Sequence, residues 1–246
     1  MKDTRASAIQ YAHEQRARFL TELKDFCTIA SISTDPTVQP EMLRAAEWVA
    51  GQLRSLGLQN VQVIPTSGHP VVYGDSLGAP GKPTLLIYGH YDVQPPDPLD
   101  LWKSDPFEPT ERGEHLFARG VTDMKGQIMA TIKAAESIIH TGDLPINIKY
   151  LIEGEEEIGS PSLDAFLENH RKMLACDLVL NPDTGILGPD LPTIAYGLRG
   201  LAYFFHRGPP DDLDISSRTA SATIAGTDFV VAVDDRERLT VTLLDG

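Results

Sequence analysis

Cysteine and basic side chains are scarce in this sequence. Only 2 of its 246 residues are cysteine, and Cys27 and Cys176 form neither a CxxC pair nor a disulfide framework. Lysine and arginine number 21 against 35 aspartates and glutamates, which gives a formal net charge of −14. This charge argues against a nucleic-acid-binding surface and against a basic helix lying on a membrane. We therefore expect a reduced, cytoplasmic protein that binds neither nucleic acid nor membrane.

Long apolar runs are missing as well. No stretch approaches the ~20 apolar residues that a membrane span needs, and the first residues, MKDTRASAIQ, lack the apolar segment of a secretory signal. The sequence is 41% hydrophobic, which is enough to form a core and excludes disorder throughout. A chain of this length makes one large domain or two small ones.

Helical and strand patterns alternate over the first 180 residues. The clearest helix carries a stripe of apolar residues three or four positions apart: Met42, Ala46, Val49, Leu53 and Leu56. The expected helices cover residues 5–30, 42–56, 124–139 and 161–170. The expected strands cover residues 61–64, 71–73, 84–88, 146–152 and 177–180. This alternation predicts an α/β fold, a three-layer domain around a mostly parallel sheet.

The chain changes character near residue 192. The segments TIAYG, LAYFFHR, DFVVAV and LTVTLL have the composition of strands, whereas GPPDDLDISSRTASA (208–222) is polar and is expected to be irregular. We therefore expect one domain over residues 1–191 and the start of a smaller unit over 192–246.

Acidic residues and one histidine follow the expected strands or open a helix. They are His90, Asp92, Asp123, Glu156, Glu157 and Asp183. Each alone has an ordinary interpretation as a cap, a turn former or a surface group, but ligands of α/β sheets bind where the strands end. Carboxylates that converge there raise one another's pKa, and bound cations remove that cost. One imidazole with several carboxylates suits a divalent metal of the zinc kind.

The spacing of these residues suggests a separate chemical role for each. Asp92, two residues after His90, is placed to accept the other N–H of the imidazole and so to orient it. Of two adjacent glutamates, one can bind metal while the other acts as a general base. Gly154 and Gly159 allow the backbone to approach closely, or form simple turns.

Three segments carry a resemblance to a known family: GHYDVQPPDPLDLWKSDPFEP, LFARGVTDMKGQ and EGEEEIGSPSLDAFL. From about residue 10 to 205 the chain closely resembles the co-catalytic zinc metallopeptidases that include aminoacylase, carboxypeptidase G and succinyl-diaminopimelate desuccinylase. Within that family it is most similar to the carnosinase-type (cytosolic nonspecific) dipeptidases. The resemblance implies a three-layer zinc-peptidase-like domain followed by the start of a smaller α+β lid domain.

The resemblance also implies a role for each residue. Glu156 matches the general base and Asp92 the acid that orients the histidine. The metal ligands would be His90 and Asp183 on the first ion, Glu157 on the second, and Asp123 bridging both. The implied reaction hydrolyses the peptide (amide) bond of a dipeptide or an N-acyl amino acid at two Zn²⁺ ions. Mn²⁺ or Co²⁺ is the alternative metal. The family further implies a cis peptide bond between Asp123 and Met124. A homodimer formed through the lid domain is possible.

The C-terminal part departs from the family. A histidine near the family's C-terminus completes the second metal site, and His206, the sole histidine after Asp183, does not match it. Residues 212–216 read DLDIS where this branch carries DLHSG. We expect the second metal position to bind weakly. The alternative to an active peptidase is therefore a truncated, catalytically inactive metal-binding remnant.

A competing motif occurs at Gly74–Gly78, where GDSLG fits the G-x-S-x-G pattern of serine esterases. A nucleophilic serine needs a helix directly after it, but APGKP follows here. No histidine has the aspartate three residues earlier that a GDSL-type esterase requires. A turn between two strands is the preferred interpretation.

Overall fold

The computed structural model describes residues 4–185 and, beyond them, the backbone of five short strands. The chain divides into two compact units, Met1–Asp183 and Thr184–Gly246. Each unit is described by itself.

The first unit is built around a five-stranded sheet. Its strands are β1 (Gln59–Ile64), β2 (Val71–Ser76), β3 (Thr84–His90), β6 (Asn147–Glu153) and β7 (Leu178–Leu180), in the order β1-β2-β6-β3-β7. The pairs β1·β2 and β2·β6 are antiparallel, while β6·β3 and β3·β7 are parallel. A short link is enough between the antiparallel β1 and β2, but the parallel β3 and β6 need a crossover. That crossover contains helix α4.

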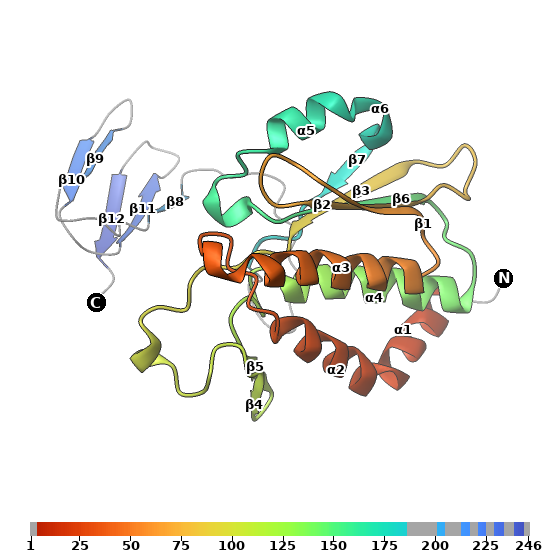
Figure 1. Ribbon diagram of the computed structural model, residues 1–246, viewed down its shortest axis with the longest axis horizontal. Coiled ribbons are helices and arrows are strands. Elements are labelled where there is room, and N and C mark those ends of the chain that lie inside the picture. Colours follow the sequence, from red (N-terminus) through yellow and green to blue (C-terminus); the bar gives the residue numbers. More distant parts are fainter. Residues whose placement is uncertain are drawn as a thin grey trace. The chain divides into compact units, whose positions relative to one another are not determined.

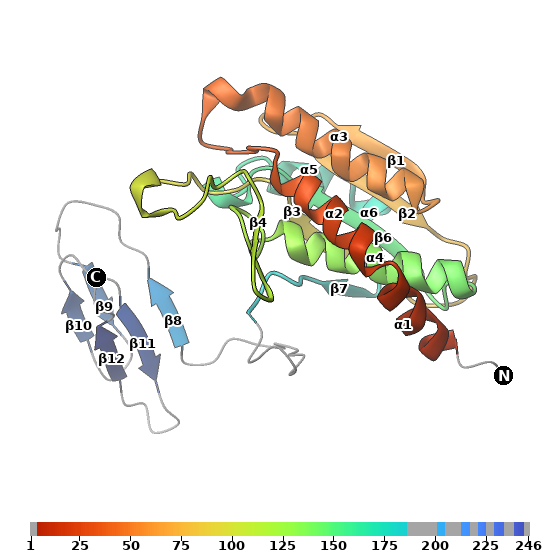
Figure 2. The same ribbon diagram turned by 90° about the horizontal axis from the view of Figure 1, so that it is seen from below.

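Helices cover both faces of this sheet (Figure 1, Figure 2). One face carries α1 (Thr4–Glu14), α2 (Arg16–Cys27), α3 (Gln39–Ser55) and α4 (Lys125–Thr141). The other face carries the shorter α5 (Leu163–Asn169) and α6 (Arg171–Leu174). Three single turns of 3₁₀ helix lie in the connections: η1 (Pro36–Val38), η2 (Leu99–Leu101) and η3 (Glu156–Ile158). The predicted three-layer α/β architecture is confirmed.

Two apolar cores separate the layers, because successive side chains of a strand point to opposite faces. In β6, Tyr150 and Ile152 pack in the core under α3 and α4, while Leu151 packs in the core under α5 and α6. The predicted stripe of α3 is buried against the first core: Met42, Ala46, Val49 and Leu53 are at most 1% exposed. Burial of this stripe fixes α3 on the sheet.

Several expectations need correction in the first unit. The helix expected over 5–30 is two helices, separated at Gln15. A small hairpin, β4 (Thr110–Arg112) with β5 (His115–Phe117), was not anticipated. Ser76 of the esterase-like motif is the last residue of β2 and pairs with Ile148, with no helix after it. The esterase interpretation is therefore excluded, but the predicted turn is right only in part: Gly74–Ser76 belong to β2, and only Leu77 and Gly78 lie in the connection that follows it.

The described strands of the second unit form two small antiparallel sheets. They are β8 (Leu201–Phe204), β9 (Leu213–Ser216), β10 (Ser221–Ile224), β11 (Phe229–Val233) and β12 (Leu239–Leu243). One sheet has the order β12-β11-β8, and the other pairs β9 with β10. The expected irregularity of 208–222 is thus wrong, because β9 lies within it and β10 begins in it. The strand expected at TIAYG and His206 lie outside the described residues.

Among the described residues, no helix combines the length and the apolar character that crossing a membrane demands.

Candidate metal centre

The predicted site residues lie where the parallel strands end. His90 is the last residue of β3, Glu156 and Glu157 open the η3 turn after β6, and Asp183 follows β7. Asp123 precedes α4, and the peptide bond between Asp123 and Met124 is cis, as the family resemblance implied. β6, β3 and β7 are neighbours in the sheet (Figure 1). Their carboxyl ends therefore bring these side chains to one end of the sheet.

Glycines allow these segments to approach closely. A Cβ atom on Gly89 would lie 3.0 Å from Cε of Met124, so this glycine lets the start of α4 pack against the end of β3. A Cβ atom on Gly154 would lie 2.3 Å from the hydroxyl of the buried Tyr91. Gly159 has a φ of +86°, which favours glycine. The predicted close approach is thus present at Gly154 but not at Gly159, where a Cβ atom would have no neighbour within 4 Å and the alternative, a simple turn, holds.

His90 is the centre of the cluster, and its side chain is fully buried. Its Nε2 atom lies 3.1 Å from Oδ1 of Asp123, 3.6 Å from Oδ2 of Asp183 and 3.8 Å from Oε2 of Glu156. The carboxylates are more exposed, with the Asp123 side chain 60% accessible. A buried imidazole therefore faces a group of carboxylates that solvent can reach.

Two groups of potential metal ligands have donor atoms within 4.8 Å of one another. One contains His90, Asp123 and Glu157, and the other contains His90, Glu156 and Asp183. These groups differ from the ligand sets implied by the resemblance, because Glu156 joins one of them and both depend on His90. Imidazole and carboxylate are the donors that zinc-type sites use, so the residues fit a divalent cation.

The charges in the cluster also fit a cation. Burial works against the charged form of His90, but hydrogen bonds to Asp123 and Asp92 outweigh it and raise the pKa of the imidazole to about 11. The hydrogen bond to His90 lowers the pKa of Asp123. Burial raises the pKa of Glu156, Glu157 and Asp183, and neighbouring carboxylates add to each shift. The positive charge of one imidazolium does not neutralise the negative charge of all these carboxylates. A bound cation would reduce the repulsion that remains among them.

Asp92 makes contacts on two sides and is fully buried. On one side, Nδ1 of His90 lies 3.0 Å from its backbone carbonyl oxygen and 3.4 Å from its carboxylate. On the other side, the carboxylate accepts hydrogen bonds from the backbone N–H groups of Glu156, at 3.3 Å, and Glu157, at 3.1 Å. Asp92 therefore connects the histidine to the turn with the two glutamates, a connection that sequence reasoning did not anticipate.

Two further side chains near the cluster were missed. Nε2 of Gln94 donates a 2.7 Å hydrogen bond to Oε2 of Glu157. Glu153, at the end of β6 and 2% exposed, accepts hydrogen bonds from the hydroxyls of Tyr88 and Ser160. Both residues lie inside the segments that carry the family resemblance, but their types alone do not distinguish them from surface residues.

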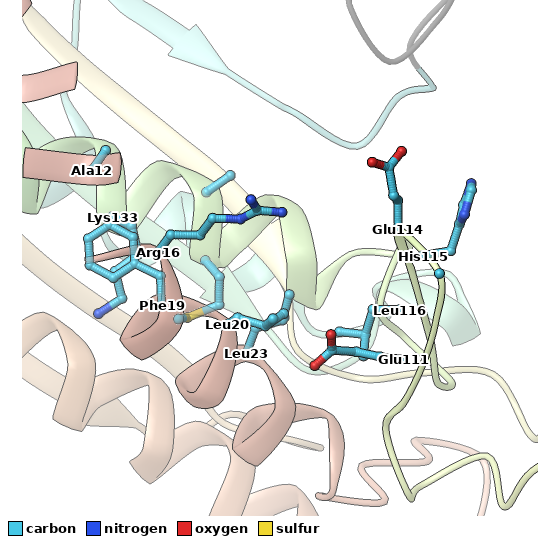
Figure 3. Close-up of a pocket in the computed structure, with 13 residues that line it drawn as sticks. Ala12, Arg16, Phe19, Leu20, Leu23, Glu111, Glu114, His115, Leu116 and Lys133 are labelled. Carbon is cyan, nitrogen blue, oxygen red and sulfur yellow. The ribbon is translucent and has the colours of Figure 1, made fainter. Parts of the chain in front are cut away.

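A separate hollow of about 350 Å³ lies between α2, α4 and the β4–β5 hairpin (Figure 3). Apolar side chains such as Phe19, Leu20 and Leu116 line it, together with the charged Arg16 and Glu114. None of the six candidate residues is among the described residues that line it.

Comparisons with known proteins point to one family of peptidases. Residues 86–237 match the pattern of peptidase family M20/M25/M40. The chain is 35% identical to a Cys-Gly metallodipeptidase of Schizosaccharomyces pombe over 217 residues, which are 81% of this chain and 45% of that protein. It is 34% identical to the human Beta-Ala-His dipeptidase over 227 residues, which are 85% of this chain and 44% of that protein.

Structural comparison gives a matching result. The crystal structure of human carnosine dipeptidase 1 has a TM-score of 0.72 and 34% sequence identity, with 80% of this chain and 44% of that chain covered. The chain thus spans about half the length of the curated relatives it matches. From the family pattern, these relatives and the shared fold, we conclude that the chain belongs to peptidase family M20/M25/M40.

Proposed function

We propose that this protein is a metal-dependent hydrolase that cleaves the peptide bond of dipeptides or the amide bond of N-acyl amino acids. The observation that carries the proposal is the convergence of four carboxylates on the buried His90 at the carboxyl ends of β3, β6 and β7. Membership of the family and the printed names of the relatives, Cys-Gly metallodipeptidase and Beta-Ala-His dipeptidase, supply the class of substrate.

In this proposal the site holds two Zn²⁺ ions, with Mn²⁺ or Co²⁺ as substitutes. His90 and Asp183 would hold the first ion, Glu157 the second, and Asp123 both. When bound, such ions supply a Lewis acid for the scissile carbonyl group and lower the pKa of water. Asp92 keeps the imidazole of His90 and the backbone of the glutamate turn in place.

Glu156 is the proposed general base. It takes a proton from the attacking water molecule and returns that proton to the leaving amine. Its side chain is 38% exposed, so a substrate can reach it, while burial and neighbouring carboxylates raise its pKa. Bound cations would offset the contribution of the carboxylates but not that of burial, and a carboxylate whose pKa is raised by burial is a better proton acceptor near neutral pH than an ordinary glutamate.

The rest of the organisation belongs to the same proposal. We assign residues 1–191 to the catalytic domain and 192–246 to a partial lid domain, with a homodimer through the lid and a cytoplasmic location. Cys27, which is buried, and Cys176, which is exposed, are both free; disulfides are rare in that compartment.

The test is hydrolysis of Cys-Gly and β-Ala-His by the purified chain with added Zn²⁺ or Mn²⁺. We expect turnover that a chelator removes and that Glu156→Ala abolishes. Glu168→Ala is the matched control, because Glu168 is 68% exposed on α5 and pairs only with its neighbour Arg171 among the described residues. No turnover by folded, metal-loaded protein would instead select the inactive metal-binding remnant.

A further inference from the structure

The turn that carries Glu156 and Glu157 has an unusual backbone. It runs from Glu155 to Ser162, and its N–H groups at Ile158 and Ser160 both donate to the carbonyl oxygen of Glu155, at 3.2 and 2.8 Å. Its path also requires positive φ angles at Gly159 (+86°) and Ser160 (+51°). A non-glycine residue such as Ser160 rarely adopts this conformation, so side-chain contacts must help to hold the turn.

One such contact is the side chain of Glu155, which is 4% exposed. Its Oε1 atom accepts a 3.1 Å hydrogen bond from the backbone N–H of His69. Its Oε2 atom accepts another, also 3.1 Å, from the backbone N–H of Ser162. The carboxylate therefore joins the far end of its own turn to the segment between β1 and β2.

The segment 66–69 is itself firmly attached. The ring of His69 contacts the backbone carbonyl oxygen of Ser33 at 3.1 Å, and Ser67 shares a 2.9 Å hydrogen bond with Ser162. At Gly68, a Cβ atom would lie 1.7 Å from Oε1 of Glu155, so only glycine leaves room for the carboxylate. The segment thus provides a fixed and closely fitted support for Glu155.

We propose that Glu155 is a positioning residue: by linking the 66–69 segment to the η3 turn, its carboxylate fixes Glu156 and Glu157. This inference rests on the proposed function. Asp92 holds the same turn from the side of β3, so two buried carboxylates fix its backbone from opposite ends. A displacement of about 1 Å at a reacting group can lower the rate by ~10²-fold, which gives this support a catalytic consequence.

The test compares Glu155→Gln with a matched buried carboxylate. The glutamine keeps the shape but replaces one acceptor oxygen with an NH₂ group that faces a backbone N–H. Asp75→Asn is the control, because Asp75 is also 4% exposed and accepts hydrogen bonds from Tyr73 and Asn60 in β2 and β1, outside the metal centre. Glu155→Asp, which keeps the charge, is the second variant if the glutamine variant does not fold.

We expect Glu155→Gln to lower kcat about 10–100-fold, as loss of a group supporting metal-site residues does. KM should stay within roughly threefold, because substrate contacts are retained. Hydrogen exchange should become faster in residues 67–69 and 156–162 together. Asp75→Asn should change neither kcat nor this exchange.

The proposal is overturned if kcat stays within about twofold of the wild type, or if Asp75→Asn lowers it equally. It is also overturned if exchange in the two segments is unchanged in a folded Glu155 variant. If the wild-type chain has no turnover, the proposed function fails separately. The exchange measurement then decides alone whether Glu155 links the two segments.

Discussion

Metal binding to this site should release a proton from His90. In the metal-free protein, hydrogen bonds to Asp123 and Asp92 outweigh the effect of burial and raise the pKa of the imidazole to about 11. A metal ion binds only the neutral imidazole, so the proton must leave first. The perturbation is therefore the addition of Zn²⁺ or Mn²⁺ to the metal-free protein at a series of pH values.

The size of the effect follows from the pKa. At pH 7 the imidazole lies about 4 units below its pKa, and each unit corresponds to ~1.36 kcal/mol. Removing the proton therefore costs about 5 kcal/mol and weakens the apparent metal affinity by roughly 10⁴-fold. Between pH 7 and 8 the apparent association constant should rise about tenfold from this group alone.

The assay is titration calorimetry in buffers of different ionisation enthalpy, which counts the protons released. At pH 8 we expect about one proton per chain more for the wild type than for His90→Gln. A histidine with the ordinary pKa of about 6.5 would be almost fully neutral at that pH and would release almost none. Wild-type protein that binds the metal at pH 8 with no more proton release than His90→Gln would refute the electrostatic reasoning.

Three other changes have defined outcomes. Asp92→Ala removes the carboxylate that accepts hydrogen bonds from the turn with Glu156 and Glu157, so it should weaken Zn²⁺ binding about 10–100-fold. Competition with a coloured chelator measures this affinity. An unchanged affinity would contradict the positioning role of Asp92. Burial lowers the pKa of Lys125 to about 8, so an unfolded chain binds more protons than the folded one between that pH and about 10.5. Over this range the unfolding free energy of the wild type should rise by about 3 kcal/mol relative to that of Lys125→Met, measured by urea titration in the presence of a chelator. If the unfolding free energies of the two proteins change equally with pH, the lowered pKa of Lys125 is disproved. β7 pairs only with β3 among the described strands, so it is an edge strand, and its Val179 is 62% exposed. Val179→Lys should therefore reduce self-association measured by light scattering. Equal scattering by both proteins would show that this edge does not mediate association.

The sequence alone predicted the elements whose hydrophobic pattern extends over many residues. The apolar stripe of α3 and the continuous apolar run of β3 are long enough for their periods to be read, and both elements are present. The convergence of the acids followed from this, because strand ends in parallel neighbours share one edge. Convergence alone did not determine which residues share a cation, since that depends on side-chain conformations.

The rest depended on features with no local signal. No glycine or proline separates α1 from α2, so the break at Gln15 could not be seen. The strands of the β4–β5 hairpin have three residues each, which is too short for a period. Glu155, Glu156 and Glu157 are identical in type, and only the fold determines that the first is buried under the turn while the second faces His90.

The unequal lengths of the strands have a consequence for how a bound cation would leave. β3 and β6 are paired over seven residues, but β7 has only three, and all three of its side chains are exposed. Local opening begins in elements with few buried contacts, so β7 is expected to open before its neighbours. Asp183 follows this strand, and a cation would lose that ligand first. The residence time of the metal would then be governed by the fraying of a three-residue strand rather than by the chemistry of His90.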